Sequence, residues 1–290
     1  DHESIGRIII DYLKDQFHGT LPLSQHMFTG LYHRPFFHQL ISGQLDLDRL
    51  DYLSRDSFYT GVAEGVVGHD RILRMLQVVD DQLVVEEKGL YSIEKFLVAR
   101  RIMYWQVYLH KTVLAAELMA KRVVQLLWQE NLLARAPYIA PELNYFLSQP
   151  IDLNAFRNDL EHVLPHFQLL DDVSIEYSFK HLQNYPSRPI AFLTSHLINR
   201  NLHKIQWSDR DFEPSEIEAV TSEAQRKYGW SKEEADTLVW TGSEAIKAYT
   251  VDQDEIQILT KDGDILPFSA FLNPAVEISL NRKYFLCYPA

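Results

Sequence analysis

The chain has 290 residues, of which 46% are hydrophobic, and its 40 acidic against 28 basic side chains give a formal net charge of −12. This composition can bury the core of one large domain or two, and its acidic balance argues against a broad basic face for nonspecific nucleic-acid binding. A single cysteine, Cys287, excludes a disulfide within the chain and a thiolate metal cluster. Because neither an apolar run of about eighteen residues nor a secretion leader is visible, we expect a cytoplasmic protein without a membrane span.

The first part of the chain predicts a series of helices followed by a hairpin. Apolar residues recur at helical spacing, and glycines at 61, 65 and 68 interrupt the pattern. The expected elements are helices over 4–17, 35–41, from 48 onward and over 70–76, then two short strands within 77–85 around an acidic turn. From Ser92 to about Asn131 there is no proline or glycine, which predicts one long helix or two nearly continuous helices.

The prolines at 137 and 141 mark a plausible boundary between two parts of the chain. We therefore expect a helical core over 1–135 and an accessory region over 136–290. The accessory region predicts helices over 152–164, 174–183, 189–201 and 215–228, then strands over 255–260 and 283–288. The fold class that follows is mainly α, with a short β-hairpin and a small C-terminal α+β region.

The segment Gln44–Asp56 concentrates polar chemistry on one side of a helix. At about 100° per residue from Asp48, its polar residues fall within an arc of roughly 140° while two leucines point the other way: Asp48, Asp51, Tyr52, Arg55 and Asp56 against Leu50 and Leu53. Asp51 and Arg55 are also an ordinary i,i+4 pair, so a solvated surface helix is the plain alternative.

The sequence LDLDRLDYLSRDSFYTG at 45–61 contains Asp-x-Asp-[Arg/Lys]-x-Asp-Tyr-x-x-Arg-Asp. It resembles the segment that closes the active site in HD-domain phosphohydrolases of the deoxynucleoside triphosphate triphosphohydrolase type, which include the SAM and HD domain enzyme and bacterial dGTPase-like proteins. The flanking HQLISGQ and EKGLYSIEKFLVARRIMYWQVYLHKT are similar to the bacterial branch, and the resemblance is strongest over about 36–115. It implies a divalent metal ion (Mg, Mn, Fe, Ni or Zn), a homo-oligomer and a nucleotide activator.

The resemblance implies a role for Asp48 as a metal ligand. The family holds one metal ion with a His, a His-Asp pair and a later Asp, and Asp48 matches the last of these; on the residues alone it is a cap or surface group. We expect the other ligands upstream of residue 1, unless the centre has been lost. His69-Asp70 comes after Asp48 and reads as a helix start. The histidines at 26, 33 and 38 follow no ligand spacing, which favours structural roles.

The same resemblance implies substrate contacts. His2 and Glu3 correspond to a catalytic pair at the phosphates, able to donate to an oxygen or act as general acid; a frayed terminus is the alternative. Arg49 corresponds to a phosphate-binding position, and Tyr52 and Asp56 to sugar contacts.

Further along, Tyr108 matches a tyrosine that relatives press against the sugar. Tyr104 and Lys111 share its helix face and are expected to bind substrate as well, although core packing with a satisfied hydroxyl is the alternative for the tyrosines.

These residues lead to a functional hypothesis. We expect a metal-dependent phosphohydrolase that cleaves a deoxynucleoside triphosphate to deoxynucleoside and triphosphate. Two alternatives stay open: another HD-type nucleotide phosphatase or phosphodiesterase, and a noncatalytic nucleotide-binding scaffold. Because the chain is acidic, substrate phosphates must be neutralised locally by a metal ion and a few basic groups.

Overall fold

The computed structural model describes residues 2–17, 21–246, 255–271 and 281–290. These residues are mostly helical with two small sheets, which confirms the predicted fold class. The chain divides into two compact units: unit 1 comprises Asp1–Leu109 and Ala245–Asn281, and unit 2 comprises His110–Glu244 and Arg282–Ala290. This division differs from the predicted boundary at 135/136: residues 110–135 belong to unit 2, and two short strands within 257–267 join the sheet of the N-terminal hairpin in unit 1.

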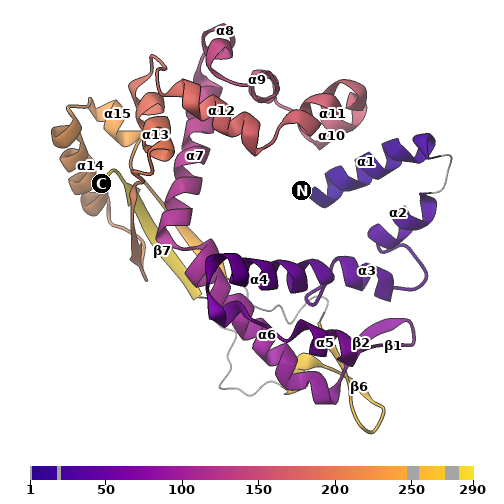
Figure 1. The fold of residues 1–290 in the computed structure, drawn as a ribbon. Helices are drawn as coiled ribbons and strands as arrows, with labels where there is room; N and C mark the ends of the chain where they lie inside the picture. The colour runs from indigo at the N-terminus through magenta and orange to yellow at the C-terminus, as the bar shows by residue number, and fades with distance from the viewer. Residues whose placement is uncertain (1, 18–20, 247–254, 272–280) are drawn as a thin grey trace. The chain divides into compact units, whose positions relative to one another are not determined.

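Unit 1 contains helices and a four-stranded sheet, with α5 and α6 beside the sheet (Figure 1). Its helices are α1 His2–Gln16, α2 Pro22–Phe28, α3 Phe36–Ile41, α4 Leu47–Thr60, α5 His69–Met75 and α6 Leu90–Met103. Its strands are β1 Leu76–Val79, β2 Gln82–Glu86, β5 Gln257–Leu259 and β6 Ile265–Pro267. Helix α3 contacts β2, and α4 contacts α6.

The predicted hairpin is present as β1 and β2, joined by a tight turn. Asp80 and Asp81 both have positive φ, 49° and 59°, as a type I′ turn requires. Strand β5 then pairs parallel to β2, with Val85 opposite Ile258, and β6 pairs antiparallel to β5. The sequence predicted β5 but not β6, whose three residues are too few to show an alternating pattern.

Helix α4 follows from its caps and its apolar face. The Asp46 side chain accepts a hydrogen bond from the backbone N–H of Arg49 at 2.7 Å, and Gly61 ends the helix with φ +72°. Leu50 and Leu53 are buried against the core of unit 1, which also contains Phe96 from α6. Burial of each such side chain contributes about 1.5–3 kcal/mol, so the opposite, polar face of α4 is fixed in place.

The stretch from Ser92 to about Asn131, predicted as one long helix or two nearly continuous helices, forms two helices. Helix α6 continues into a π-helical turn at Tyr104–Tyr108, and α7 Lys111–Gln129 begins a new helix with His110 as its N-cap. His110 has an extended ψ of 138°, and its Nδ1 accepts from the backbone N–H of Thr112 at 3.3 Å. The interruption needs neither proline nor glycine, so the sequence pattern did not reveal where it lies.

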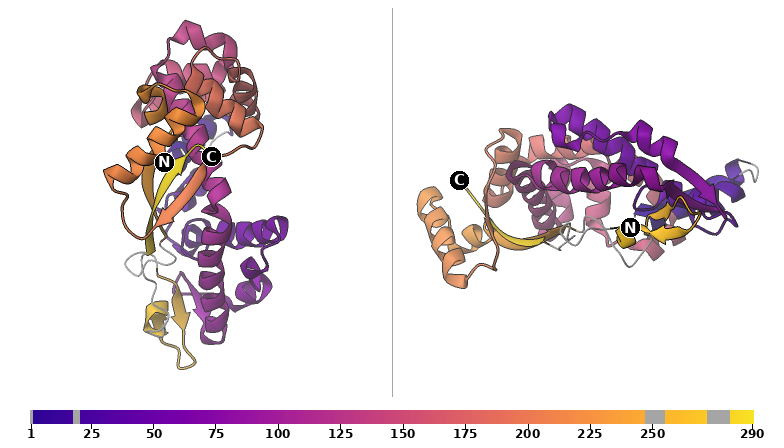
Figure 2. Two further views of the ribbon diagram at one scale, coloured as in Figure 1. Left: turned by 90° about the vertical axis from the view of Figure 1, so that its left-hand side faces the viewer. Right: turned by 90° about the horizontal axis from the view of Figure 1, so that it is seen from below.

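Unit 2 contains the remaining helices and a three-stranded sheet of order β3-β7-β4, with the yellow strand β7 in its centre (Figure 2). Its elements are α7, α8 Leu132–Arg135, α9 Pro141–Ser148, α10 Leu153–Asn158, α11 Leu160–Leu169, α12 Asp172–Leu182, α13 Arg188–Ile198, β3 Lys204–Ser208, α14 Pro214–Tyr228, α15 Lys232–Asp236, β4 Trp240–Ile246 and β7 Asn281–Tyr288; β4 and β7 extend slightly past the division between the units.

Most of the helices predicted in unit 2 are present, with corrections. The helix predicted at 152–164 is two helices, α10 and α11, because the chain bends at Asp159, which has φ −127° and ψ 39°. Strands β3 and β4 were not predicted. The core of the unit is formed by α7, α9, α12 and α13, and includes Met119, Leu127 and Leu193. None of the described helices is both long and apolar enough to span a bilayer.

Candidate functional site

The start of α4 is held by one buried carboxylate. Asp46, whose side chain is 5% exposed, accepts from the backbone N–H of Arg49 and, at 3.3 Å, from that of Gly43. The guanidinium of Arg49 donates through Nη1 to Asp46 and to the carbonyl of Gly43. The neighbouring carboxylate, Asp48, is exposed in the first turn of the helix. The structure therefore places Arg49 and Asp48 together at one helix end, with Arg49 anchored by protein groups.

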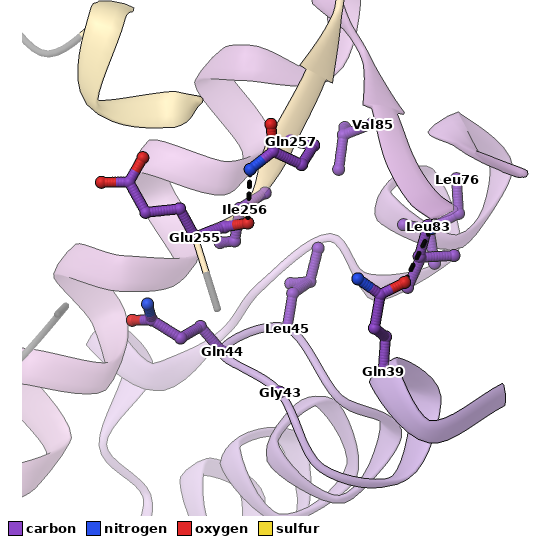
Figure 3. Close-up of a pocket in the computed structure, with 10 residues that line it drawn as sticks. All are labelled: Gln39, Gly43, Gln44, Leu45, Leu76, Leu83, Val85, Glu255, Ile256 and Gln257. Atoms are coloured by element: carbon purple, nitrogen blue, oxygen red, sulfur yellow. Dashed lines mark hydrogen bonds between the residues drawn. The ribbon is translucent and has the colours of Figure 1, made fainter. Parts of the chain in front are cut away.

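The chain that enters α4 is fixed from the sheet side (Figure 3). A cavity of about 40 Å³ lies between the segment 43–45 and strands β2 and β5, lined mainly by aliphatic side chains. Beside it, Gln39 of α3 accepts from the backbone N–H of Leu83 at 2.8 Å and donates to Gln82 at 3.0 Å. Leu45 is buried at 5% exposure. These contacts tie the entry of α4 to the sheet.

Further along α4, tyrosines and an aspartate form a cluster with the π-helical turn that follows α6. The Tyr108 hydroxyl donates to Asp56 Oδ2 at 2.6 Å, and the Tyr108 ring lies edge-on to Tyr104 and Tyr52, with centroids 5.1 and 6.2 Å apart. All four side chains are half-buried. The predicted sugar-contact residues Tyr52, Asp56 and Tyr108 are therefore brought together, along with Tyr104.

Burial and neighbouring charges act on the hydroxyls of Tyr108 and Tyr52 in this cluster. Burial raises the pKa of Tyr108, and its hydrogen bond to Asp56 adds to the rise. Burial also raises the pKa of Tyr52, with Tyr104 adding to the rise, while the positive charges of Arg100 and Arg49 act in the opposite direction. Neutral hydroxyls beside a carboxylate suit hydrogen bonding to a polyhydroxyl ligand such as a sugar.

Arg100 is a site candidate that the sequence analysis did not single out. Its guanidinium carbon lies 5.8 Å from the centroid of the Tyr104 ring, and its charge acts on Tyr52. The predicted substrate-binding residues on this stretch were the tyrosines and Lys111 instead. The spacing of four residues from Arg100 to Tyr104 and again to Tyr108 is the signal that could have found it.

His2 and Glu3 begin α1, and both are exposed. Glu3 accepts a hydrogen bond from the Ser42 hydroxyl at 3.3 Å. Ser42 directly precedes Gly43, whose carbonyl accepts from Arg49, so Glu3 is linked to the entry of α4. The alternative of a frayed terminus does not describe Glu3, because this contact joins it to the end of α3.

Lys111 does not share a helix face with the tyrosines, because the helix is broken between them. It is the first residue of α7 in unit 2 and lines a cavity of about 590 Å³. The wall of this cavity also includes Arg200 and Lys204, and no acidic residue is among its lining residues, which are Lys111, Thr112, Arg200, Leu202, His203, Lys204, Ile205, Gln206 and Tyr288. This is a basic cavity in an acidic chain, and we call it the unit 2 cavity.

The donor set for a metal ion is incomplete among the residues that the structure describes. Over 2–17, 21–246, 255–271 and 281–290, no three His, Cys, Asp or Glu side chains converge as ligands. A protein metal site normally needs about three ligands, so Asp48 alone does not make a metal centre.

Asp70 lies in the first turn of α5, as the prediction of a helix start requires, and its Oδ1 is 3.4 Å from Nε2 of His69. His38, of the predicted structural histidines, packs against Gly30.

The remaining residues of the α4 motif have structural contacts. Arg55 forms an ion pair with Asp51, whose side chain is 65% exposed, as the i,i+4 spacing predicted. Such an exposed pair contributes at most about 1 kcal/mol. It stiffens the polar face of α4 without belonging to the cluster.

Comparison with known proteins places these features in context. A family model described as the HD associated region matches residues 67–137. The chain is 33% identical over 178 residues to the protein YwfO of Bacillus subtilis, covering 61% of this chain and 38% of YwfO. It is 26% identical over 183 residues to the deoxynucleoside triphosphate triphosphohydrolase SAMHD1 homolog of Dictyostelium discoideum, covering 61% of this chain and 33% of that protein. The chain thus spans about a third of these two relatives.

A solved structure gives a fuller match. A phosphohydrolase from Bacteroides thetaiotaomicron superposes with a TM-score of 0.91 at 39% identity, and the match covers 100% of this chain and 72% of that one. The similarity extends through both units, and the HD associated region spans the hairpin, α6 and α7. From this match and the shared region, the chain belongs to the family of HD-type phosphohydrolases.

Proposed function

We propose that this protein hydrolyses deoxynucleoside triphosphates to deoxynucleoside and triphosphate, with α4 as its main substrate-binding element. The observation that carries the proposal is the cluster in which Tyr108 donates to Asp56 while Tyr52 and Tyr104 pack around it. Flat aromatic rings can pack on a deoxyribose, and the free oxygen of Asp56 can accept from a 3′-hydroxyl. The relative from Dictyostelium discoideum named for this activity supports the substrate class.

The proposal assigns the phosphates to the start of α4. Tyr52 lies one helical turn from Asp48 and Asp56 one turn further, so a sugar at the cluster directs its phosphates toward Arg49. A guanidinium suits bidentate binding of phosphate oxygens. Asp48 is proposed as one carboxylate ligand of a divalent metal ion, and His2 with Glu3 as the acid and base groups on the phosphate side.

The unit 2 cavity offers a place for the nucleotide activator that the resemblance implied. Three cations line it, at Lys111, Arg200 and Lys204, and they supply the local positive charge that a nucleotide's phosphates need in an acidic chain. We therefore propose that Lys111 acts there rather than on the substrate. A homo-oligomer is part of the same proposal, and sedimentation with and without nucleotide tests it.

The decisive experiment is product analysis with each deoxynucleoside triphosphate. We expect inorganic triphosphate as the phosphate product; pyrophosphate or monophosphate would instead identify another nucleotide phosphatase. Binding without turnover by the full chain would identify a nucleotide-binding scaffold.

Three variants locate the site. Asp48→Ala should abolish turnover. Tyr108→Phe keeps the ring and loses the bond to Asp56, so kcat/KM should fall roughly tenfold, as expected for a hydrogen bond to a charged group. Asp51→Ala removes a carboxylate from the same helix and breaks only the exposed pair with Arg55, so it is the matched control. Equal activity of all three variants would reject the assignment of α4.

A further inference from the structure

The entry of α4 contains a buried carboxylate, Asp46, to which the roles proposed for the motif residues assign nothing. The side chain of Asp46 is 5% exposed, whereas that of its partner Arg49 is 30% exposed. An ionised carboxylate at this depth requires compensation, because a buried charge without partners is strongly unfavourable. Asp46 obtains it from two backbone N–H groups, of Arg49 and Gly43, and from the guanidinium of Arg49.

The contacts of Arg49 use one corner of its guanidinium. Nη1 donates both to Asp46 and to the carbonyl of Gly43. Among the residues that the structure describes, the guanidinium donates only through this nitrogen, so the edge formed by Nε and Nη2 is left for another acceptor. That edge has the fork geometry that binds two phosphate oxygens.

We propose that Asp46 is a positioning residue: its carboxylate fixes the guanidinium of Arg49 by one corner, so that the opposite edge is held ready for a phosphate group of the ligand. The identity of the ligand, a triphosphate, rests on the proposed function, whereas the contacts between Asp46 and Arg49 come from the structure. Immobilising a long, flexible side chain before binding removes part of the entropic cost of binding. Asp46 itself does not contact the phosphate in this proposal. Removal of its charge should nevertheless weaken phosphate binding, because Arg49 is then no longer held in place.

The capping role and the positioning role of Asp46 can be separated by substitution. Asp46→Asn and Asp46→Ser both retain a good N-cap for the N–H of Arg49. Asparagine loses the negative charge, and serine is in addition too short to reach the guanidinium. Asp51→Asn is the matched control, since it neutralises a carboxylate paired with an arginine on the same helix. All three variants should keep the urea unfolding midpoint of the parent protein.

The test measures binding of inorganic triphosphate to the full chain by calorimetry, which needs no turnover. We expect Asp46→Asn and Asp46→Ser to weaken binding about tenfold, Asp51→Asn to leave it unchanged, and Asp46→Asn to have no further effect in an Arg49→Ala background. In turnover assays KM should rise about tenfold while kcat changes less than threefold.

Two outcomes would overturn the proposal. One is a loss of binding in Asp46→Asn no larger than in Asp51→Asn, and the other is a loss of the same size with and without Arg49. Failure of the proposed function alone would give a different result. No deoxynucleoside triphosphate would be hydrolysed, but Asp46→Asn would still weaken triphosphate binding when Arg49 is present and would have no effect when Arg49 is replaced.

Discussion

Several single residues of this protein have environments that set their charge. Tyr108 and Tyr52 are kept neutral by burial and by their neighbours, so they act as hydrogen-bond donors throughout the physiological range. In unit 2, His203 is 5% exposed, its backbone N–H donates to the sulfur of Met119 at 3.3 Å, and its ring packs 5.3 Å from that of Trp240. Burial lowers the pKa of His203 to about 3, and His196 adds to the decrease.

The depressed pKa of His203 predicts acid sensitivity. The folded state favours the neutral imidazole, so the unfolding free energy from this group is fully present above pH 6.5 and is lost as the pH falls toward 3. Between pH 7 and pH 5 the loss should be about 2 kcal/mol.

Urea unfolding at the two pH values checks this prediction. His203→Phe retains an aromatic ring and should flatten the pH dependence, whereas His162→Gln, at an exposed histidine, should not. Identical acid limbs in the two variants would contradict it.

At the scale of elements, unit 1 depends on the close approach of α4 and α6. Gly65 lies between them in a 3₁₀ turn over 63–65, where it is buried. A Cβ atom at this position would lie 2.6 Å from Met103 Sδ and 2.8 Å from Ser57 Cβ, closer than real contacts allow. The absence of a side chain at Gly65 lets the turn pack against both helices; α4 carries Asp56, and α6 continues into the π-helical turn that carries Tyr108.

Gly65→Ala should therefore destabilise unit 1 by about 1–3 kcal/mol through overpacking. Gly68→Ala is the control, because its Cβ would be 3.9 Å from the nearest atom, at an ordinary φ of −78°. Urea denaturation measures both variants, and we expect Gly68→Ala, which changes only the N-cap of α5, to lose less than about 1 kcal/mol. Equal losses in the two variants would show that the contact with Met103 relaxes without cost.

At the scale of the whole molecule, the chain forms two units that are not consecutive in sequence. It passes between them at 109–110, 244–245 and 281–282. Each unit has buried side chains of its own, with Leu53 fully buried in unit 1 and Leu127 in unit 2. Separate cores predict that damage to one unit is felt mainly within that unit.

Hydrogen exchange measured by mass spectrometry tests this independence. Leu53→Ala should raise deuterium uptake in α4 and α6, and Leu127→Ala in α7, α9 and α13, since each creates a cavity that costs about 2–5 kcal/mol. Uptake that rises throughout the chain in either variant would show that both units unfold in one cooperative step.

The sequence by itself determined the elements whose signals are local. The alternation around Asp80-Asp81 predicted the hairpin, apolar spacing predicted α4 with Leu50 and Leu53 inward, and the motif at 45–61 identified the candidate residues on its polar face. These signals depend on neighbours within a turn or two of the chain. They can therefore be read from the sequence before the fold is known.

Only the tertiary structure decided the rest. The break at Leu109–His110 ended the helical stretch of the tyrosines before Lys111, which begins a new helix in unit 2, and the pairing of β5 with β2 brought residues 255–271 into unit 1. It also brought Asp56 of α4 to the hydroxyl of Tyr108, 52 residues later. Contacts between distant segments depend on how buried faces pack together, and no periodicity within one segment encodes that choice.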